Sequence, residues 1–158
     1  MESPVVERLD EGELHRIKPL LVELYLGEQP HFADHPQLSR EQLEEQVDEI
    51  SPRFGGENVV FAARTAGGEL AGFCWCVLFD PGTGLEGEVA EVYVSPSHRG
   101  LRVGEALLER AVGLFRERGV TLAYVWTREE NEPAVRLYRG AGFQPSRQLV
   151  LTWYPSDS

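Results

Sequence analysis

The chain has 158 residues, a net charge of −11 and a hydrophobic content of 42%, which is typical of one globular domain with an ordinary core. No apolar run approaches the roughly 18 residues of a membrane span, and the acidic excess argues against a nucleic-acid partner. The first residues also lack the apolar stretch of a signal peptide, so we expect a cytoplasmic protein that does not associate with membranes.

The first predicted elements are a short strand at residues 5–9 and a helix that follows it. Asp10, with Glu13 three residues later, has the pattern of a capping box at the start of this helix. Pro19 lacks the N–H that a helix interior needs, so we expect a kink or break there.

A second helix is predicted to begin after Ser39 and to continue through Ile50, because Ser39 and Gln42 repeat the capping-box pattern. The loop before it contains two histidines and a carboxylate, which could ligate zinc. No strand or helix orients these side chains, so we expect no metal at this set: His31, Asp34 and His35.

Three strands joined by turns should come next, at residues 58–64, 70–79 and 86–94. The middle one is apolar on both faces and is therefore expected at the centre of the sheet. Its Cys74 and Cys76 do not have zinc-site spacing, which favours buried thiols in a core strand.

A loop rich in glycine and arginine joins the third of these strands to an amphipathic helix. Pro96 ends the strand, apolar residues recur at helical spacing from Leu101 onward, and Gly119 suits the left-handed end of a helix. A helix N-terminus has unpaired N–H groups and a partial positive charge. With arginine forks and glycines that allow close approach, these residues predict a pyrophosphate cradle: Arg99, Gly100, Arg102 and Gly104.

Three kinds of phosphate cradle are possible for this loop. A dinucleotide fingerprint needs G-x-G-x-x-G, and a nucleotide-triphosphatase loop needs G-K-[ST]; neither is present. The loop resembles the R-x-x-G-x-G/A sequence of the GNAT superfamily of N-acetyltransferases, with Arg102 in place of the inner glycine. An ordinary basic loop that caps a core helix is the alternative.

A second motif supports the resemblance. Residues 131–143 read N-E-P-A-V-R-L-Y-R-G-A-G-F, which is similar to the family's N-x-x-A-x-x-L-Y-x-x-x-G-F at the family's distance from the first motif. The strand expected at 120–127 should run parallel to strand 86–94, because a helix connects them. Residues 143–154 should supply one or two final strands.

The resemblance implies a single GNAT acetyltransferase domain over residues 1–158, in the α/β (α+β) class. Its mixed, mostly antiparallel sheet would have six to seven strands, with the fourth and fifth splayed apart, and about four flanking helices. Helices at about 10–50 would shape the acceptor site, and residues from about 58 to 154 would form the cofactor-binding core.

The implied reaction is direct transfer of acetyl from acetyl-CoA, as co-substrate, to a primary amine. Tyr138 matches the tyrosine that the family places beside the coenzyme sulfur, and it is the candidate general acid. No metal is expected. The residues implied to bind the cofactor are Val92, Tyr93, Val94, Arg99, Gly100, Leu101, Arg102, Val103, Gly104 and Asn131.

The sequence leaves three candidates for the general base: two glutamates and a chain of water molecules. Glu88 and Glu91 are three residues apart, so an unbroken strand would point them to opposite faces. Counting back from Arg99 favours Glu88, whereas Glu91 directly precedes the residues expected at the pantetheine arm.

Two other functions are alternatives to an acetyltransferase. A non-catalytic acyl-CoA sensor is favoured by Arg102 and disfavoured by Tyr138, and a nucleotide-binding α/β domain fails on its motifs. The acceptor could be an amine-bearing small molecule or a peptide; the negative charge favours a cationic one, although solubility explains it equally well. The sequence does not identify the preferred acyl chain. A homodimer is possible by analogy with the family.

Overall fold

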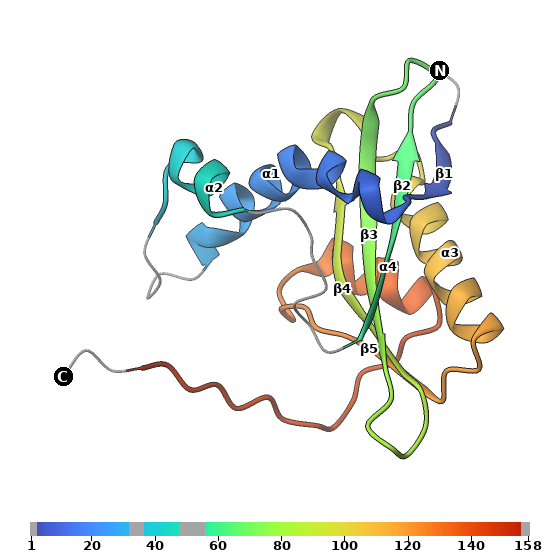
Figure 1. Cartoon of the computed structure of the whole chain (residues 1–158). Helices are drawn as coiled ribbons and strands as arrows, with labels where there is room; N and C mark the ends of the chain where they lie inside the picture. The colour runs from blue at the N-terminus through green and yellow to red at the C-terminus, as the bar shows by residue number, and fades with distance from the viewer. Residues whose placement is uncertain (1–2, 32–36, 48–55, 156–158) are drawn as a thin grey trace.

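The computed structural model describes residues 3–31, 37–47 and 56–155, which form one sheet with helices on both faces (Figure 1). The strand order follows the chain, with antiparallel pairing from the first to the fourth strand and parallel pairing between the last two. The mixed α/β class predicted from the sequence is confirmed. The strands are β1 (Val5–Arg8), β2 (Glu57–Arg64), β3 (Leu70–Phe79), β4 (Glu86–Val94) and β5 (Leu122–Val125).

The helices divide between the two faces of the sheet. The first pair packs with the core on one face, and the second pair packs with the core on the other. No helix in the described ranges is long and apolar enough to cross a membrane. The α-helices are α1 (Lys18–Glu28), α2 (Arg40–Gln46), α3 (Val103–Glu117) and α4 (Glu132–Gly140), and the 3-10 helices are η1 (Glu11–Ile17), η2 (Gln29–His31) and η3 (Pro96–His98).

Side chains of the inner strands point alternately to the two faces of the sheet, which produces these two cores. In β2, Val60 and Ala62 face the α1 side, whereas Val59 and Phe61 face the α3 side, as period-two geometry requires. The central position and two buried faces expected for residues 70–79 are confirmed, because β3 lies between β2 and β4.

The helix starts follow the sequence predictions in part. The capping box of Ser39 and Gln42 is present in both directions, and Pro19 lies in the first turn of α1, directly after η1, so the expected break is confirmed. The box at Asp10 is wrong: the side chain makes no capping bond, because its backbone carbonyl accepts the Glu13 N–H at 2.8 Å in a 3-10 turn. Ile50 lies outside the described residues.

The last strands expected at residues 143–154 are absent, so the described sheet has five strands instead of six or seven. The chain turns back after α4, where the Phe143 N–H donates to the Tyr138 carbonyl at 3.0 Å, and then runs away from the sheet (Figure 1). Leu149, Leu151 and Trp153 are 81%, 85% and 83% exposed. Strand-like sequence forms a strand only beside a partner edge, and none lies along this segment in the described residues.

Candidate active site

β4 and β5 pair only over part of their length. The parallel ladder joins Glu86–Val89 to Leu122–Val125, whereas β4 continues to Val94. Residues 90–94 therefore present an outer edge with no strand partner in the described part of the chain. The predicted splay of these two strands is confirmed, and it leaves backbone N–H and C=O groups of β4 open to a ligand.

A β-bulge in β4 decides where its glutamates point. Val89 pairs with Cys76 and Glu91 pairs with Trp75, so Ala90 is the extra residue. Glu88 pairs with Val77, two residues from Trp75, and directly paired side chains lie on the same face. Glu88 and Glu91 therefore share a face, unlike in the unbroken strand considered above.

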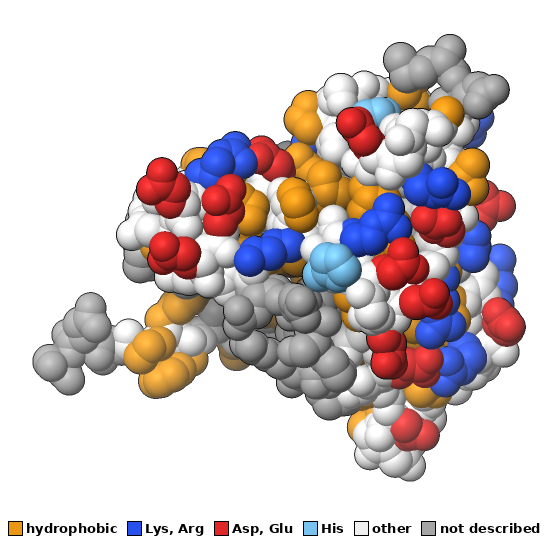
Figure 2. Space-filling view, turned by 45° about the horizontal axis from the view of Figure 1, so that its top comes forward, with side chains coloured by type: hydrophobic (Ala, Val, Ile, Leu, Met, Phe, Trp, Pro, Cys, Tyr) orange, Lys and Arg blue, Asp and Glu red, His pale blue; other side chains and the backbone are white. Residues whose placement is uncertain are grey.

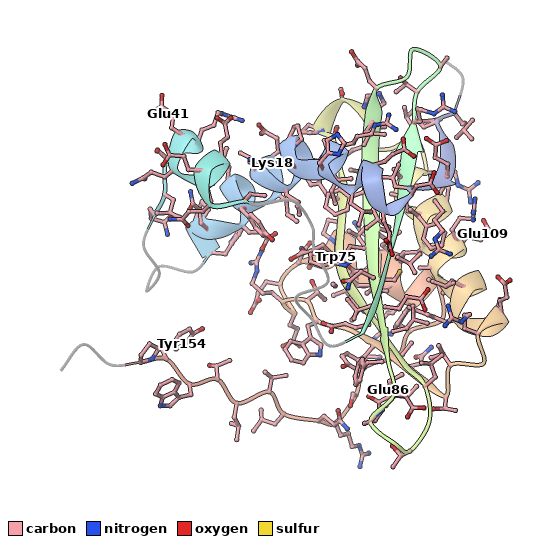
Figure 3. The ribbon with its side chains drawn as sticks, in the orientation of Figure 1. Lys18, Glu41, Trp75, Glu86, Glu109 and Tyr154 are labelled. Atoms are coloured by element: carbon pink, nitrogen blue, oxygen red, sulfur yellow. The ribbon has the colours of Figure 1, made fainter. Side chains whose placement is uncertain are left out.

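That shared face is the one covered by α1. Trp75, which lies opposite Glu91 and is labelled in Figure 3, packs against the core on this side. Both glutamates are half-buried, and burial raises the pKa of Glu88.

Glu91 has the more strongly altered environment. Burial raises the pKa of its carboxyl group to about 7, with further contributions from the negative charges of Glu28 and Glu88. Burial also raises the pKa of Tyr25 on α1, and Glu91 adds to that effect. A carboxyl group with a pKa near 7 can accept a proton at physiological pH.

Glu28 is a charged neighbour of Glu91 that the sequence did not indicate. It lies at the end of α1 and forms an ion pair with Arg128, at 3.7 Å between Oε2 and Nη2. Arg128 follows β5 in the chain, so this pair bridges α1 and the segment before α4. No local pattern connects two residues 100 positions apart, and the sequence held no signal for this pair.

Tyr138 on α4 lies near groups from both faces of the sheet. Its pKa is raised, first by burial and then by Cys74, Glu91 and Glu28. Cys74 belongs to the core on the α3 side, whereas Glu91 lies on the α1 side. The Tyr138 side chain packs against the same core as Val92 and Val94 of β4.

The loop before α3 contains two residues in the left-handed conformation. Gly100 and Arg102 have positive φ angles of 80° and 62°, and the side chain of Arg102, the N-cap residue, makes no capping bond. The first N–H groups of α3 therefore receive no cap from the N-cap side chain. The helix begins at Val103 and not at Leu101, because a left-handed residue cannot continue a right-handed helix.

The other residues of the loop hold it in place. Arg99 Nε donates to the Val94 carbonyl at 3.1 Å, and its guanidinium lies 5.9 Å from the centre of the Tyr93 ring. A Cβ on Gly104 would lie 3.2 Å from Leu137 Cδ2. Gly104 thus also permits close packing of α3 on α4.

The other residues predicted to bind the cofactor differ in their burial and contacts. The side chains of Val92 and Val94 pack with the α3 core, so only their main-chain groups remain for a ligand. Leu101 is exposed, and Val103 is buried. The side chain of Asn131 caps α4 by accepting the Ala134 N–H at 3.4 Å.

Of the residues considered for a metal, the structure describes His31 and the two cysteines. Within the described ranges no group of three or more His, Cys, Asp or Glu could hold a metal ion. His31 is exposed, and Asp34 and His35 lie outside the described residues. Cys74 and Cys76 are buried free thiols, as predicted, with their sulfur atoms 3.8 Å apart.

Comparison with known proteins gives a consistent result. The model of the acetyltransferase (GNAT) family matches residues 19–143. The mycothiol acetyltransferase of Thermobifida fusca is 40% identical over 119 residues, which are 72% of this chain and 37% of that protein. The one from Sanguibacter keddieii is 35% identical over 133 residues, or 80% of this chain and 41% of that protein.

A solved structure supports the fold. The ribosomal-protein-alanine N-acetyltransferase from Brucella melitensis superposes with a TM-score of 0.67 at 20% identity, covering 95% of this chain and 99% of the other. The chain thus spans about two fifths of the curated relatives that it matches, but almost the whole of a solved acetyltransferase domain.

Proposed function

Because the chain belongs to the GNAT acetyltransferase family, we propose that it transfers the acetyl group of acetyl-CoA directly to a primary amine. The observation that carries the proposal is the unpaired edge of β4 at residues 90–94. The start of α3 lies beyond one end of this edge, Glu91 belongs to the edge, and Tyr138 packs against the same core as Val92 and Val94. These positions support one candidate anion-binding group and two candidate proton-transfer groups around the edge.

The cofactor would bind through the backbone of β4 and the loop before α3. The N–H and C=O groups of Val92 and the N–H of Val94 point to the outer edge, because Ser95 donates to Ala71 on the β3 side and the groups of successive residues alternate. These groups suit an extended amide-bearing arm, whereas the Val94 carbonyl already accepts from Arg99 Nε. The pyrophosphate would accept bonds from the first N–H groups of α3, with charge from Arg99 and Arg102. The free amide nitrogen of Asn131 could donate to the arm.

Glu91 is the residue that we propose as the general base. An acceptor amine has a pKa near 10 and is mostly protonated at neutral pH, so its proton must be removed before attack. The carboxyl pKa of about 7 suits this role better than the ordinary environment of an exposed glutamate. Glu88, on the same face, would add negative charge that attracts the ammonium group.

Tyr138 is the residue that we propose as the general acid. The departing thiolate needs a proton, and a phenol that burial keeps protonated can donate one. Its packing against Phe143, with ring centres 6.3 Å apart, would limit the positions of the hydroxyl group.

The acceptor is proposed to be a small cationic amine. Three carboxylates, Glu28, Glu88 and Glu91, influence the region beneath α1, and Arg128 is the cation paired with one of them. The curated relatives are named for mycothiol, so amine precursors of mycothiol belong among the first acceptors to test.

We also propose that the protein forms a homodimer through its C-terminal segment, residues 147–154. This segment lies away from its own sheet, and Figure 2 shows hydrophobic surface projecting there. Its exposed apolar side chains are Leu149, Val150, Leu151, Trp153 and Tyr154. The outer edge of β5 is unpaired in the described sheet, and Leu122 and Trp126 are 52% and 67% exposed beside it. Pairing of the segment with β5 of a second copy would cover both surfaces.

The test is release of the coenzyme A thiol from acetyl-CoA with a panel of mycothiol precursors, polyamines, aminoglycosides, amino acids and short peptides. We expect release with one amine class and a loss of about 100-fold in kcat for Tyr138→Phe. Tyr124→Phe, on β5, is the matched control and should retain activity. Calorimetric binding of acetyl-CoA without turnover on any amine would instead favour the acyl-CoA sensor.

A further inference from the structure

A groove of about 490 Å³ runs along α3 where α4 packs against it. Its walls combine apolar side chains with three arginines and two glutamates: Arg102, Arg116, Arg136, Glu105 and Glu109. The volume is within the range of small-molecule sites. A concentration of arginine on a chain of net charge −11 indicates a site for an anionic group.

The groove begins at the proposed pyrophosphate cradle. Arg102 belongs to both, since it lines the groove and is the N-cap of α3. The close approach of Gly104 to Leu137 brings the first turn of α3 against α4, and the neighbouring Arg136 lines the groove from the α4 side. Arg116 lies 14 residues along α3 from Arg102, a distance of about 20 Å, at the far end.

The two guanidinium groups near the cradle differ in their partners. Arg102 has a side chain that is 83% exposed, and its ion pair is with Glu105, at 2.8 Å. It holds a left-handed conformation, φ 62°, that glycine would adopt with less strain. Within the described residues, Arg136 has no ion pair or side-chain hydrogen bond.

We propose that Arg136, together with Arg102, binds the 3′-phosphate on the ribose of coenzyme A, so that the protein discriminates against cofactors that lack this phosphate. This inference rests on the proposed function, because that function places the pyrophosphate at the start of α3. A phosphate monoester carries close to two negative charges, and the planar arginine fork binds phosphate oxygens in pairs. The ribose is joined to the pyrophosphate, which keeps its 3′-phosphate near the cradle and away from Arg116.

Glu105 and Glu109 also line the groove and oppose an anion. Glu105 holds Arg102 through the ion pair described above, so the phosphate must replace this carboxylate at the guanidinium. Glu105→Gln should therefore tighten coenzyme A binding several-fold, because the competing negative charge is removed. A several-fold loss would contradict the proposed competition.

The experiment is calorimetric titration of the full chain with coenzyme A and with 3′-dephospho-coenzyme A. We expect the wild type to bind coenzyme A about 10-fold or more tightly than the dephospho form, since a charged hydrogen-bonded pair contributes that much. Arg136→Gln should reduce the preference to about 3-fold or less. Arg116→Gln removes the same charge at the far end of the groove and should keep the full preference.

Three results separate the possible failures. Equal affinity of the wild type for the two cofactors overturns the phosphate site but leaves the proposed function intact. Equal loss in the Arg136 and Arg116 variants shows a general charge effect and also overturns the site. Failure to bind either cofactor overturns the proposed function and the inference with it. Thermal unfolding of each variant verifies that it is folded.

Discussion

Burial beside Glu28 and Glu88 raises the pKa of Glu91 to about 7, so at neutral pH this carboxyl group is about half ionised. A pKa near 7 would make Glu91 useful as a base. It would also lower the stability of the folded protein, because an ionised carboxylate is disfavoured in a partly buried site. Activity and stability should therefore depend on pH over the same range.

The rate of Glu91→Gln should be lower than that of the wild type by about 100-fold or more above pH 7, because the proton acceptor is missing. The wild-type kcat/KM should increase with pH, with an apparent pKa near 7, and the variant should lack this pH-dependent limb. Glu88→Gln is the matched control on the same strand and should keep the limb. If Glu88→Gln abolishes it and Glu91→Gln does not, the assignment of the base is reversed.

The same substitution should stabilise the protein at high pH. The folded state holds the Glu91 proton up to about pH 7, whereas an unfolded glutamate releases it near pH 4.5, so folded stability falls as pH rises through that window. Glutamine mimics the protonated acid. Glu91→Gln should raise the free energy of unfolding by up to about 3 kcal/mol at pH 8.

Urea denaturation at pH 8 and at pH 4.5 measures this effect. At pH 4.5 the variant and the wild type should differ little, because Glu91 is protonated in the folded state there. An equal difference at both pH values would mean that the substitution acts through packing and not through the charge.

At the scale of elements, the active-site region depends on two interruptions of regular structure. The bulge at Ala90 turns Glu91 to the face of Glu88, and β5 ends before β4 does. A third irregularity, the left-handed Arg102, sets the start of α3. The bulge re-aims the Glu91 side chain, and the early end of β5 leaves outer backbone groups of β4 without a strand partner in the described sheet.

Arg102→Gly should separate the stability of the loop from its function. Glycine removes the left-handed strain of about 1–2 kcal/mol but loses more chain entropy on folding, so we expect a net gain of about 0.5–1 kcal/mol. Coenzyme A affinity should fall about 10-fold, because a phosphate-binding guanidinium is lost.

Urea denaturation and calorimetry on the same samples test this pair of effects. Arg102→Ala is the matched variant: it should lose the affinity without gaining stability, since alanine keeps the strained conformation. Unchanged affinity in both variants would remove Arg102 from the proposed cofactor site.

At the scale of the whole molecule, the C-terminal segment and the outer edge of β5 are two surfaces that the described fold leaves uncovered. Burying one large apolar side chain stabilises an assembly by about 1.5–3 kcal/mol. Several such side chains on each copy could support the proposed dimer.

Leu151→Glu should shift the protein from dimer to monomer in analytical ultracentrifugation, because a charge would replace an apolar side chain in the proposed interface. Gln148→Glu adds the same charge to an exposed polar position of the segment and should leave the dimer in place. A wild-type protein that sediments as a monomer at micromolar concentrations contradicts the proposed interface.

The amino-acid sequence by itself determined the family, the order of the elements and the limits of the inner strands. β3 and β4 span the predicted residues 70–79 and 86–94, because hydrophobic alternation and turn residues act over neighbouring positions. The Ser39 capping box and the position of Asn131 at the start of α4 are local in the same way.

The tertiary structure alone decided which groups meet. The shared face of Glu88 and Glu91 depends on the register of β4 against β3, the pair of Glu28 and Arg128 joins distant parts of the chain, and the C-terminal segment forms no strand in the described sheet. Register, long-range ion pairs and sheet edges depend on partners remote in sequence, which local patterns do not encode. A strand propensity at residues 143–154 therefore could not reveal whether a partner edge would lie beside it.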